Sequence, residues 1–238
     1  MGKGTDVKQT ETVGSRLGII LPIGRREHRK ASTRTELVRA GRKLFSEKGI
    51  YEARIEDLAE HAGIAKGTLY LYFASKVELV QAVVDGGFED LALGVSTAVQ
   101  GRRTFNGVIG GIVQSHLDFF EANPDLMRVF HQVRGILKFH RPEWEPLRQP
   151  LERHVAHVAR LLAQVPSPVR DRAARRRAMA LVLFGAISGA CSVRVALESG
   201  PGADRWSSLL RDGFTGLAAQ LARSDEGRRP KRRGGRPE

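Results

Sequence analysis

Residues 55–79 read IEDLAEHAGIAKGTLYLYFASKVEL, and this stretch decides the fold of the N-terminal part of the chain. Four apolar residues at its start are spaced i, i+3, i+4 and i+7, which places them on one face of a helix. They are Ile55, Leu58, Ala59 and Ala62. Gly63 follows directly, and glycine adopts the left-handed conformation of a helix C-terminus at low cost. The stretch therefore predicts a short helix that stops at Gly63.

A second short helix is predicted to begin near Lys66 and to run to Phe73. Leu69 and Phe73 are four residues apart, so they point inward together. The outer surface keeps a cation, a hydroxyl and two phenols. These are Lys66, Thr68, Tyr70 and Tyr72. Two short helices around a glycine-containing turn form a helix-turn-helix, whose second helix enters the major groove of DNA. Ser75, with Glu78 three residues later, has the pattern of a capping box and predicts the start of a third helix.

The run GIAKGTLYLYFASKVEL closely resembles the recognition segment of the TetR family of bacterial transcriptional regulators. The preceding LVRAGRKLFSEKGIYEARIEDLAEHA fits the same pattern, with Leu44, Phe45 and Gly49 at the expected places, and the close match covers residues 34–84. The chain departs from the family at two cap positions, where Arg54 and Ala65 replace the usual Ser or Thr. A weaker cap costs about 1 kcal/mol.

The resemblance and the exposed face together predict the residues that contact DNA. They are Arg54, Lys66, Gly67, Thr68, Tyr70, Leu71, Tyr72 and Lys76. The resemblance implies that the start of the second helix lies nearest the bases. Lys76 and the phenol of Tyr72 are expected at phosphates, and Leu71 at a thymine methyl group.

Composition favours a nucleic-acid partner. The 238 residues carry a net charge of +13, and a basic chain suggests a polyanion, with nucleic acid first and an anionic membrane surface second. Residues 1–30 and 223–238 each contribute +4, from seven Lys/Arg and three Asp/Glu. The single cysteine, Cys191, excludes an internal disulfide framework and fits a reducing compartment. We expect no apolar run to approach the roughly 20 residues that a membrane span requires. A cytoplasmic protein without a membrane partner is therefore predicted.

The sequence divides into four predicted segments. Residues 1–30 form a disordered basic extension, residues 31–78 a helix-turn-helix DNA-binding domain, residues 79–222 a helical ligand-binding and dimerisation domain, and residues 223–238 a disordered basic tail. The basic cluster before the first helix is either a solvated arm or an arm that reaches the DNA backbone or minor groove. Its members are Arg25, Arg26, Arg29 and Lys30.

Apolar residues repeat with a helical period throughout, and no useful alternating strand pattern occurs, so the chain is predicted to be all-α. The first helix is expected over about residues 33–48. Asn123–Pro124 and the prolines between residues 142 and 150 interrupt the later helices. Gly86–Gly87 lies inside the helix that starts near Lys76. It indicates either a bend or close packing by a neighbour.

An aromatic and polar set in residues 105–144 has the composition of a small-molecule cavity. Its members are Phe105, His116, Phe119, Phe120, Phe130, His131 and Trp144. The family resemblance implies such a cavity there, whereas the residues alone fit an ordinary core almost equally well.

A two-fold dimer interface is predicted on the helices over residues 170–197 and 204–222. Small residues on the first allow close helix approach, and apolar residues on the second give it an adhesive side. The interface residues are Gly185, Gly189, Ser192, Leu210, Phe214 and Leu217.

Three functions compete for this sequence. The first is a DNA-binding regulator that forms a homodimer, binds a double-stranded operator and is released from it by a small-molecule effector, with no cofactor, no metal and no catalysis. The second is a small all-α metal-binding protein or enzyme that uses His154 and His157, which are i, i+3 on a helix but lack further ligands nearby. The third is a basic architectural protein without sequence preference. The helix-turn-helix residues in register favour the first.

Overall fold

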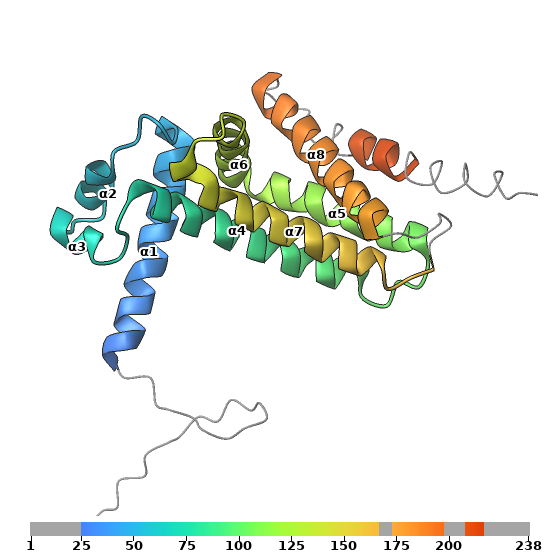
Figure 1. Cartoon of the computed structure of the whole chain (residues 1–238), viewed down its shortest axis with the longest axis horizontal. Helices are drawn as coiled ribbons and strands as arrows, with labels where there is room; N and C mark the ends of the chain where they lie inside the picture. Colours follow the sequence, from blue (N-terminus) through green and yellow to red (C-terminus); the bar gives the residue numbers. More distant parts are fainter. Residues whose placement is uncertain (1–24, 167–172, 198–207, 217–238) are drawn as a thin grey trace, which may run out of the picture. The chain divides into compact units, whose positions relative to one another are not determined.

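The computed structural model describes residues 25–166, 173–197 and 208–216 (Figure 1). No strand occurs among the residues in these ranges, and the all-α prediction is confirmed. The elements are α1 (Arg25–Lys48), α2 (Ile55–His61), α3 (Lys66–Tyr70), α4 (Lys76–Val99), α5 (Phe105–Ala122), α6 (Pro124–Leu137), the 3₁₀ helix η1 (Pro142–Leu147), α7 (Arg148–Leu162) and α8 (Ala173–Leu197). A further helical segment covers residues 208–216.

The chain comprises two compact units, residues 1–36 and residues 37–238. In the first, α1 begins at Arg25, about eight residues before the predicted start. The expected extension 1–30 is therefore helical in its last six residues. The physical reason is that Gly24 is the last helix breaker before a long run of helix-compatible residues. Thr33 and Thr35 donate their hydroxyls to the carbonyls of Arg29 and Ala31 within the same helix. The rest of that extension, and the predicted tail 223–238, lie outside the described residues.

In the second unit we call residues 37–75 the head and the described residues from 76 onward the body. Local signals shape the head as predicted. Gly63 has φ +64°, and the N–H of Ile64 donates to the carbonyl of Ala59 at 3.0 Å, which closes α2. Ser75 accepts a hydrogen bond from the N–H of Glu78, whose carboxylate accepts one from the N–H of Ala74. The Ser75 cap is confirmed and α4 starts after it, but the reciprocal bond of Glu78 reaches the N–H of Ala74, one residue before the N-cap.

The interior of the head is apolar. Leu58, Leu69 and Phe73 are fully buried there, together with Phe45 and Ile50 at the end of α1. The helix α3 ends at Tyr70, three residues before the predicted end. Because the N–H of Phe73 still bonds to the carbonyl of Leu69 at 3.1 Å, the chain completes one more turn and keeps Phe73 inward.

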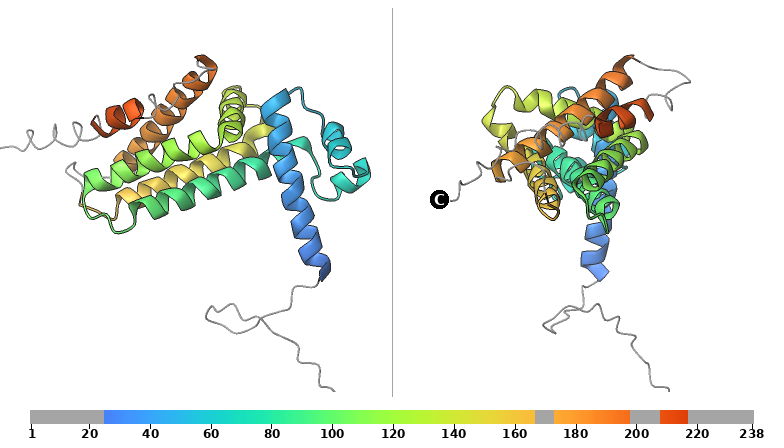
Figure 2. Two further views of the ribbon diagram at one scale, coloured as in Figure 1. Left: turned by 180° about the vertical axis from the view of Figure 1, so that it is seen from behind. Right: turned by 90° about the vertical axis from the view of Figure 1, so that its right-hand side faces the viewer.

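In the body, α4, α5 and α7 pack side by side, and α8 packs against α5, α6 and α7 (Figures 1 and 2). Their facing apolar stripes form one core with the interior of the head. Gly87 lies where α4 meets α6: a Cβ there would stand 2.9 Å from Cζ of Phe130. The close-packing interpretation of Gly86–Gly87 is confirmed at Gly87, and α4 continues unbroken from Lys76 to Val99.

One sequence expectation is wrong. Residues 173–195 of α8 are long and apolar enough to cross a membrane by length and composition, although no such run was expected. A buried helix passes the same test, and α8 inserts Phe184 and Ile187 into the core. Only 33% of the apolar window is buried, so α8 also presents an apolar face away from the core.

Candidate DNA-binding and effector sites

The end of α3 carries the most exposed apolar surface of the head. Tyr70 is 41% exposed and Leu71 is 77% exposed, while Leu69 of α3 is fully buried. Lys66 and Gly67 are exposed at the start of the same helix. A Cβ added to Gly67 would meet nothing within 4 Å, so packing inside the chain does not require a glycine there. The structure therefore brings these predicted DNA contacts together on one open surface.

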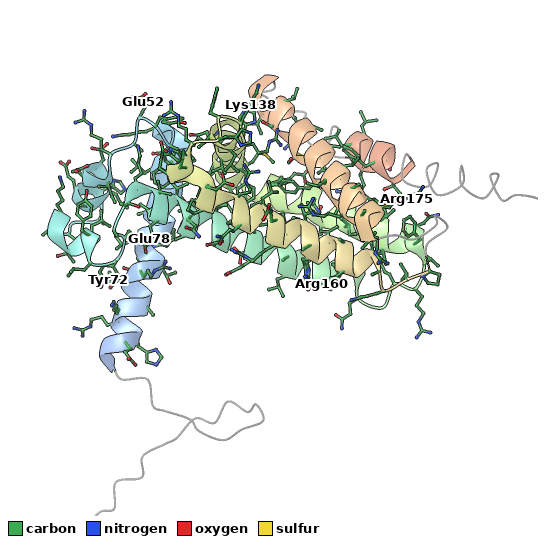
Figure 3. All side chains as sticks on the ribbon, in the orientation of Figure 1. Glu52, Tyr72, Glu78, Lys138, Arg160 and Arg175 are labelled. Atoms are coloured by element: carbon green, nitrogen blue, oxygen red, sulfur yellow. The ribbon has the colours of Figure 1, made fainter. Side chains whose placement is uncertain are left out.

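The other predicted contacts are less free. Thr68 is half-buried, and Tyr72, which follows α3, is half-buried against the core (Figure 3). Arg54 is exposed at the N-cap of α2, where it makes no side-chain cap bond, as its replacement of Ser or Thr predicts. Ala65 likewise provides no side-chain cap for α3.

Lys76 has a structural role that the sequence did not predict. Its ammonium donates to the carbonyls of Tyr51 at 2.9 Å and Ala53 at 3.0 Å. These carbonyls belong to the loop between α1 and α2, so Lys76 fastens that loop to the start of α4. No sequence pattern identifies them, because they lie 25 and 23 residues upstream. One of the three ammonium donors remains for a phosphate.

Two ion pairs cross the surface of the head. Nζ of Lys66 lies 2.5 Å from Oε1 of Glu56, and Nζ of Lys48 lies 2.8 Å from Oδ2 of Asp57. The hydrogen bond from Lys66 lowers the pKa of Glu56, and the same bond raises the pKa of Lys66. Both partners of the Lys66 pair are solvent-exposed, so the pair adds little to stability.

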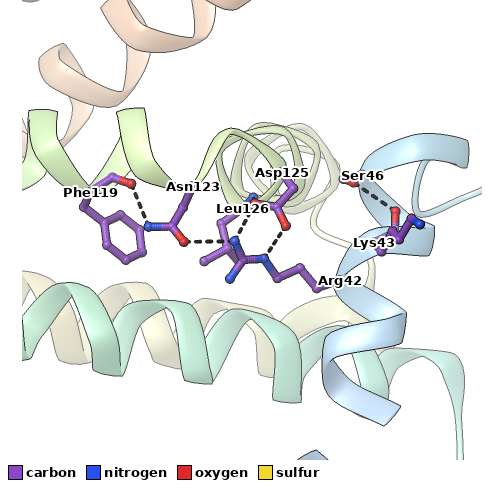
Figure 4. A network of polar contacts seen from close by, with 7 residues as sticks. All are labelled: Arg42, Lys43, Ser46, Phe119, Asn123, Asp125 and Leu126. Atoms are coloured by element: carbon purple, nitrogen blue, oxygen red, sulfur yellow. Dashed lines mark hydrogen bonds and ion pairs between the residues drawn. The ribbon is translucent and has the colours of Figure 1, made fainter. Parts of the chain in front are cut away.

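A polar network joins α1 to the corner between α5 and α6 (Figure 4). The guanidinium of Arg42 forms a bidentate pair with the carboxylate of Asp125 and also donates to Oδ1 of Asn123 at 2.9 Å. Asn123 in turn donates to the carbonyl of Phe119 at 2.8 Å. Burial acts to raise the pKa of Asp125, but the hydrogen bonds from Arg42 and from the Leu126 N–H outweigh it and lower that pKa.

Gln132 provides a second link between body and head. Its side-chain carbonyl accepts from the N–H of Ile50 at 2.6 Å, and its amide N–H donates to the carbonyl of Phe45 at 3.1 Å. One side chain of α6 thus holds both sides of the turn at Gly49. Because these bonds and those of Arg42 connect the two regions, a displacement of α6 would displace or break its contacts with the head.

The seven predicted effector residues are not gathered at one cavity. His116, Phe120 and Phe130 share one buried cluster, which Phe119 borders through a ring contact of 5.6 Å with Phe120. The other three lie elsewhere. Trp144 meets Tyr51 edge-on at 6.0 Å, Phe105 is buried at the start of α5, and His131 is exposed and bonded to Ser192 at 2.7 Å. The sequence placed all seven on neighbouring helices, but helix periodicity does not specify which face meets which neighbour.

The centre of the body holds two buried histidines. Nε2 of His116 lies 3.0 Å from Nε2 of His154, and the side chains are 0% and 2% exposed. Burial lowers the pKa of His116 to about 4. Burial and the nearby His116 lower the pKa of His154 to about 2. Both rings are therefore neutral at physiological pH.

The alternative interpretation of His154 and His157 as a metal site finds no support in the described residues. His154 faces His116 on α5, whereas Nε2 of His157 lies 2.9 Å from Oγ of Ser96 on α4. Among the described residues no three His, Cys, Asp or Glu side chains converge in a way that would hold a metal ion. Cys191 is buried, and burial raises its pKa to about 11, as expected of an inert thiol.

Among the described residues, cavities large enough for a small molecule include two that border the body. One, of about 450 Å³, is an open groove between α1, α6 and the end of α8 that includes His131, Gln132 and Ser192. The other, of about 270 Å³, lies between α4 and α7 and includes Phe88, His154 and His157. A further space, lined by Phe88, Phe130 and Phe184, measures only about 10 Å³.

The predicted interface residues fall into two groups. Gly185 and Gly189 face open space, since a Cβ on either would meet nothing within 4 Å. Leu210 and Phe214 are half-buried against the chain's own core, and Leu217 lies outside the described residues. The sequence analysis missed the exposed apolar side chains of these helices. They are Leu181, Val182, Val193 and Leu209.

Comparison with known proteins agrees with this architecture. Residues 37–83 match a family described as bacterial regulatory proteins, tetR family. The HTH-type transcriptional activator FasR of Mycolicibacterium smegmatis is 32% identical over 119 residues, which are 50% of this chain and 51% of that protein. The HTH-type transcriptional repressor KstR2 of Rhodococcus jostii is 39% identical over 62 residues, 26% of this chain and 30% of that protein.

The likeness extends further in structure than in sequence. The transcriptional regulator FadR from Bacillus subtilis, solved in complex with stearoyl-CoA, superimposes with a TM-score of 0.61 over 76% of this chain and 97% of that one, at 14% identity. At that identity the likeness shows the fold alone. The chain spans about half the length of FasR and less of KstR2. The match identifies residues 37–83 as a domain of the tetR family of bacterial regulatory proteins, and the body that follows shares the fold of solved regulators.

Proposed function

We propose that this chain is a sequence-specific DNA-binding regulator, acting as a homodimer, and that a small molecule bound in the body releases it from its operator. The observation that carries the proposal is the exposed face of α3. Lys66, Gly67, Tyr70 and Leu71 have no packing role that explains their character, whereas Leu69 fixes the helix from beneath. A cation, a phenol and an apolar tip on a rigid helix suit phosphate, base-edge and methyl contacts in a major groove.

The apolar face of α8 and the segment 208–216 supports the proposed dimerisation. Leu181, Val182 and Leu209 are exposed there, and the open Gly185 and Gly189 permit close approach of a second copy. A two-fold dimer presents two α3 helices to half-sites about 34–36 Å apart, or a multiple of that distance.

Release by a ligand requires that body and head communicate. The bonds of Arg42 with Asp125 and of Gln132 with Phe45 and Ile50 attach α6 to the head. A ligand that binds better when these contacts are rearranged lowers DNA affinity by linkage. Repression is the proposed sense of regulation. An enzymatic or metal-binding role has less support, because His154 and His157 face different partners. A cytoplasmic location belongs to the same proposal.

The test is a binding selection followed by a titration. The full chain selects duplexes from a random-sequence pool, and the enriched duplex is titrated against a scrambled version at fixed salt. We expect a specificity ratio of about 10³ or more for a regulator. Equal affinity for both duplexes would instead identify a basic architectural protein. Tyr70→Ala serves as the variant that reduces the ratio without unfolding the head.

A further inference from the structure

The buried histidines form a hydrogen-bonded chain with a defined direction. Nδ1 of His116 lies 2.7 Å from the carbonyl oxygen of Ile112, and that oxygen can only accept. Nδ1 of His116 therefore carries the proton, and Nε2 of the neutral ring is an acceptor. His154 must then donate from its own Nε2 across the 3.0 Å contact. This assignment leaves Nδ1 of His154 without a proton.

Nδ1 of His154 is a buried acceptor whose partner is absent from the described part of the chain. A buried acceptor without a donor is costly, and such groups in native proteins are normally satisfied. The ring is held from several sides. Phe88 and Phe184 lie 5.2 Å and 5.4 Å from it, centroid to centroid, and His116 completes the enclosure. The position of this acceptor is therefore fixed.

The same residue borders the cavity of about 270 Å³ between α4 and α7. Phe88, Ala92 and Pro150 provide the apolar part of its wall. The wall also contains Asp85 on α4, which is ion-paired with Arg153 on α7. The other two charged residues of the wall are also of opposite sign, since Glu89 lies on α4 and Arg160 on α7. The volume is close to the lower limit of about 300 Å³ for small-molecule sites.

The charges disfavour an ionic ligand at the inner end. A carboxylate would face the lone pair of His154 rather than a donor. A cation would gain no charged partner from the two neutral histidines. A hydroxyl, in contrast, provides the missing donor and carries no charge.

We propose that the cavity between α4 and α7 binds an uncharged, mainly apolar molecule whose hydroxyl group donates a hydrogen bond to Nδ1 of His154. The apolar body of the ligand lies along Phe88, Ala92 and Pro150. This inference rests on the proposed function, because it names the chemical class of the effector.

The experiment uses the full chain without DNA and three probes of equal chain length: octanol, methyl octyl ether and octanoate. Isothermal titration calorimetry gives each Kd. Octanol is expected to bind about fivefold to tenfold more tightly than the ether, since one net hydrogen bond to a buried acceptor has about that effect. Octanoate is expected to bind most weakly.

Two variants on α7 test whether His154 accepts the hydrogen bond from the ligand hydroxyl. His154→Phe removes the acceptor and keeps an aromatic ring, so the ratio of the octanol and ether Kd values should fall to about one. His157→Phe is the matched control, because His157 lines the same cavity but is bonded to Ser96, and it should keep the wild-type ratio. If His154→Phe does not fold, ring-nitrogen NMR of the wild type replaces it. Octanol, but not the ether, should then shift the resonance of the unprotonated Nδ1 of His154.

Equal binding of octanol and ether overturns the inference, as does tighter binding of octanoate, an unchanged ratio in His154→Phe, or no binding by any probe. Operator affinity of the ligand-free protein is measured separately. A protein that prefers octanol but binds no specific DNA would contradict the proposed function and leave the ligand class standing. A protein that binds specific DNA but does not prefer octanol would contradict the ligand class and leave the proposed function standing.

Discussion

The head and the body use polar side chains in opposite ways. In the head, cations and hydroxyls are exposed, and the ion pair of Lys66 with Glu56 lies in solvent. In the body, His116, His154 and Ser188 are buried and satisfied mainly by one another or by neighbouring helices. An exposed charge responds to salt, whereas a buried titratable group responds to pH and to ligands that enter its surroundings. Four variants test this division.

The largest expected effect comes from the exposed face of the body. Val182→Glu combined with Leu209→Glu places charges on the proposed interface and should give monomers in analytical ultracentrifugation. Operator affinity should fall about 10²- to 10⁴-fold, because the second half-site contact is lost. Leu93→Glu is the control, since Leu93 is 69% exposed on α4. A double variant that stays dimeric would remove α8 and the segment 208–216 from the interface.

The second effect concerns acid. Because the pKa of His116 is lowered to about 4 and that of His154 to about 2, the unfolded chain binds protons below pH 6.5 while the folded chain does not. Stability is therefore constant with respect to these groups above pH 6.5 and falls as the pH decreases. Each histidine should lower the free energy of unfolding by about 2 kcal/mol between pH 7 and pH 5. Urea unfolding at both pH values measures this, and the loss should shrink when both are replaced by phenylalanine.

Tyr70→Ala should have a smaller effect, and only in the head. The difference in binding free energy between operator and scrambled DNA should decrease by about 1–3 kcal/mol, while the unfolding midpoint stays close to that of the wild type. A lower midpoint with an unchanged difference would mean that Tyr70 packs the helix and does not read the bases.

Lys76→Ala should give the smallest change in DNA binding. One free donor predicts a salt slope reduced by about one for all sequences alike. Since the ammonium also holds the carbonyls of Tyr51 and Ala53, a moderate loss of thermal stability should accompany it. An unchanged slope with lowered stability would show that Lys76 only fastens the loop.

The parts of the fold that the sequence predicted are those set by neighbours in the chain. Gly63 and the Ser75 cap act over a few residues, and both were identified. Contacts over long separations were missed. The pairs Arg42–Asp125 and His116–His154 are 83 and 38 residues apart, and no periodicity indicates that such partners meet.

The predicted sites divide in the same way. On α3, residues a few positions apart share one face because the helix itself aligns them, so Lys66, Gly67, Tyr70 and Leu71 were placed together correctly. The effector set required knowledge of how α5, α6 and η1 pack, and Phe105, His131 and Trp144 were therefore assigned to a cavity they do not share. The beginning of α1 was missed because charged helix formers look like a solvated tail.

The contact between Lys66 and Glu56 has a consequence for the search along DNA. In the proposed DNA contact of Lys66, the carboxylate of Glu56 would compete with a phosphate, because the ammonium already has an anion at 2.5 Å. A DNA phosphate must displace this internal competitor, and it gains only the difference between two anions. A duplex that positions its phosphate well replaces the carboxylate, whereas a poorly fitting duplex gains less from this side chain. Replacing Glu56 with glutamine should therefore raise the affinity for scrambled DNA by at most about fivefold.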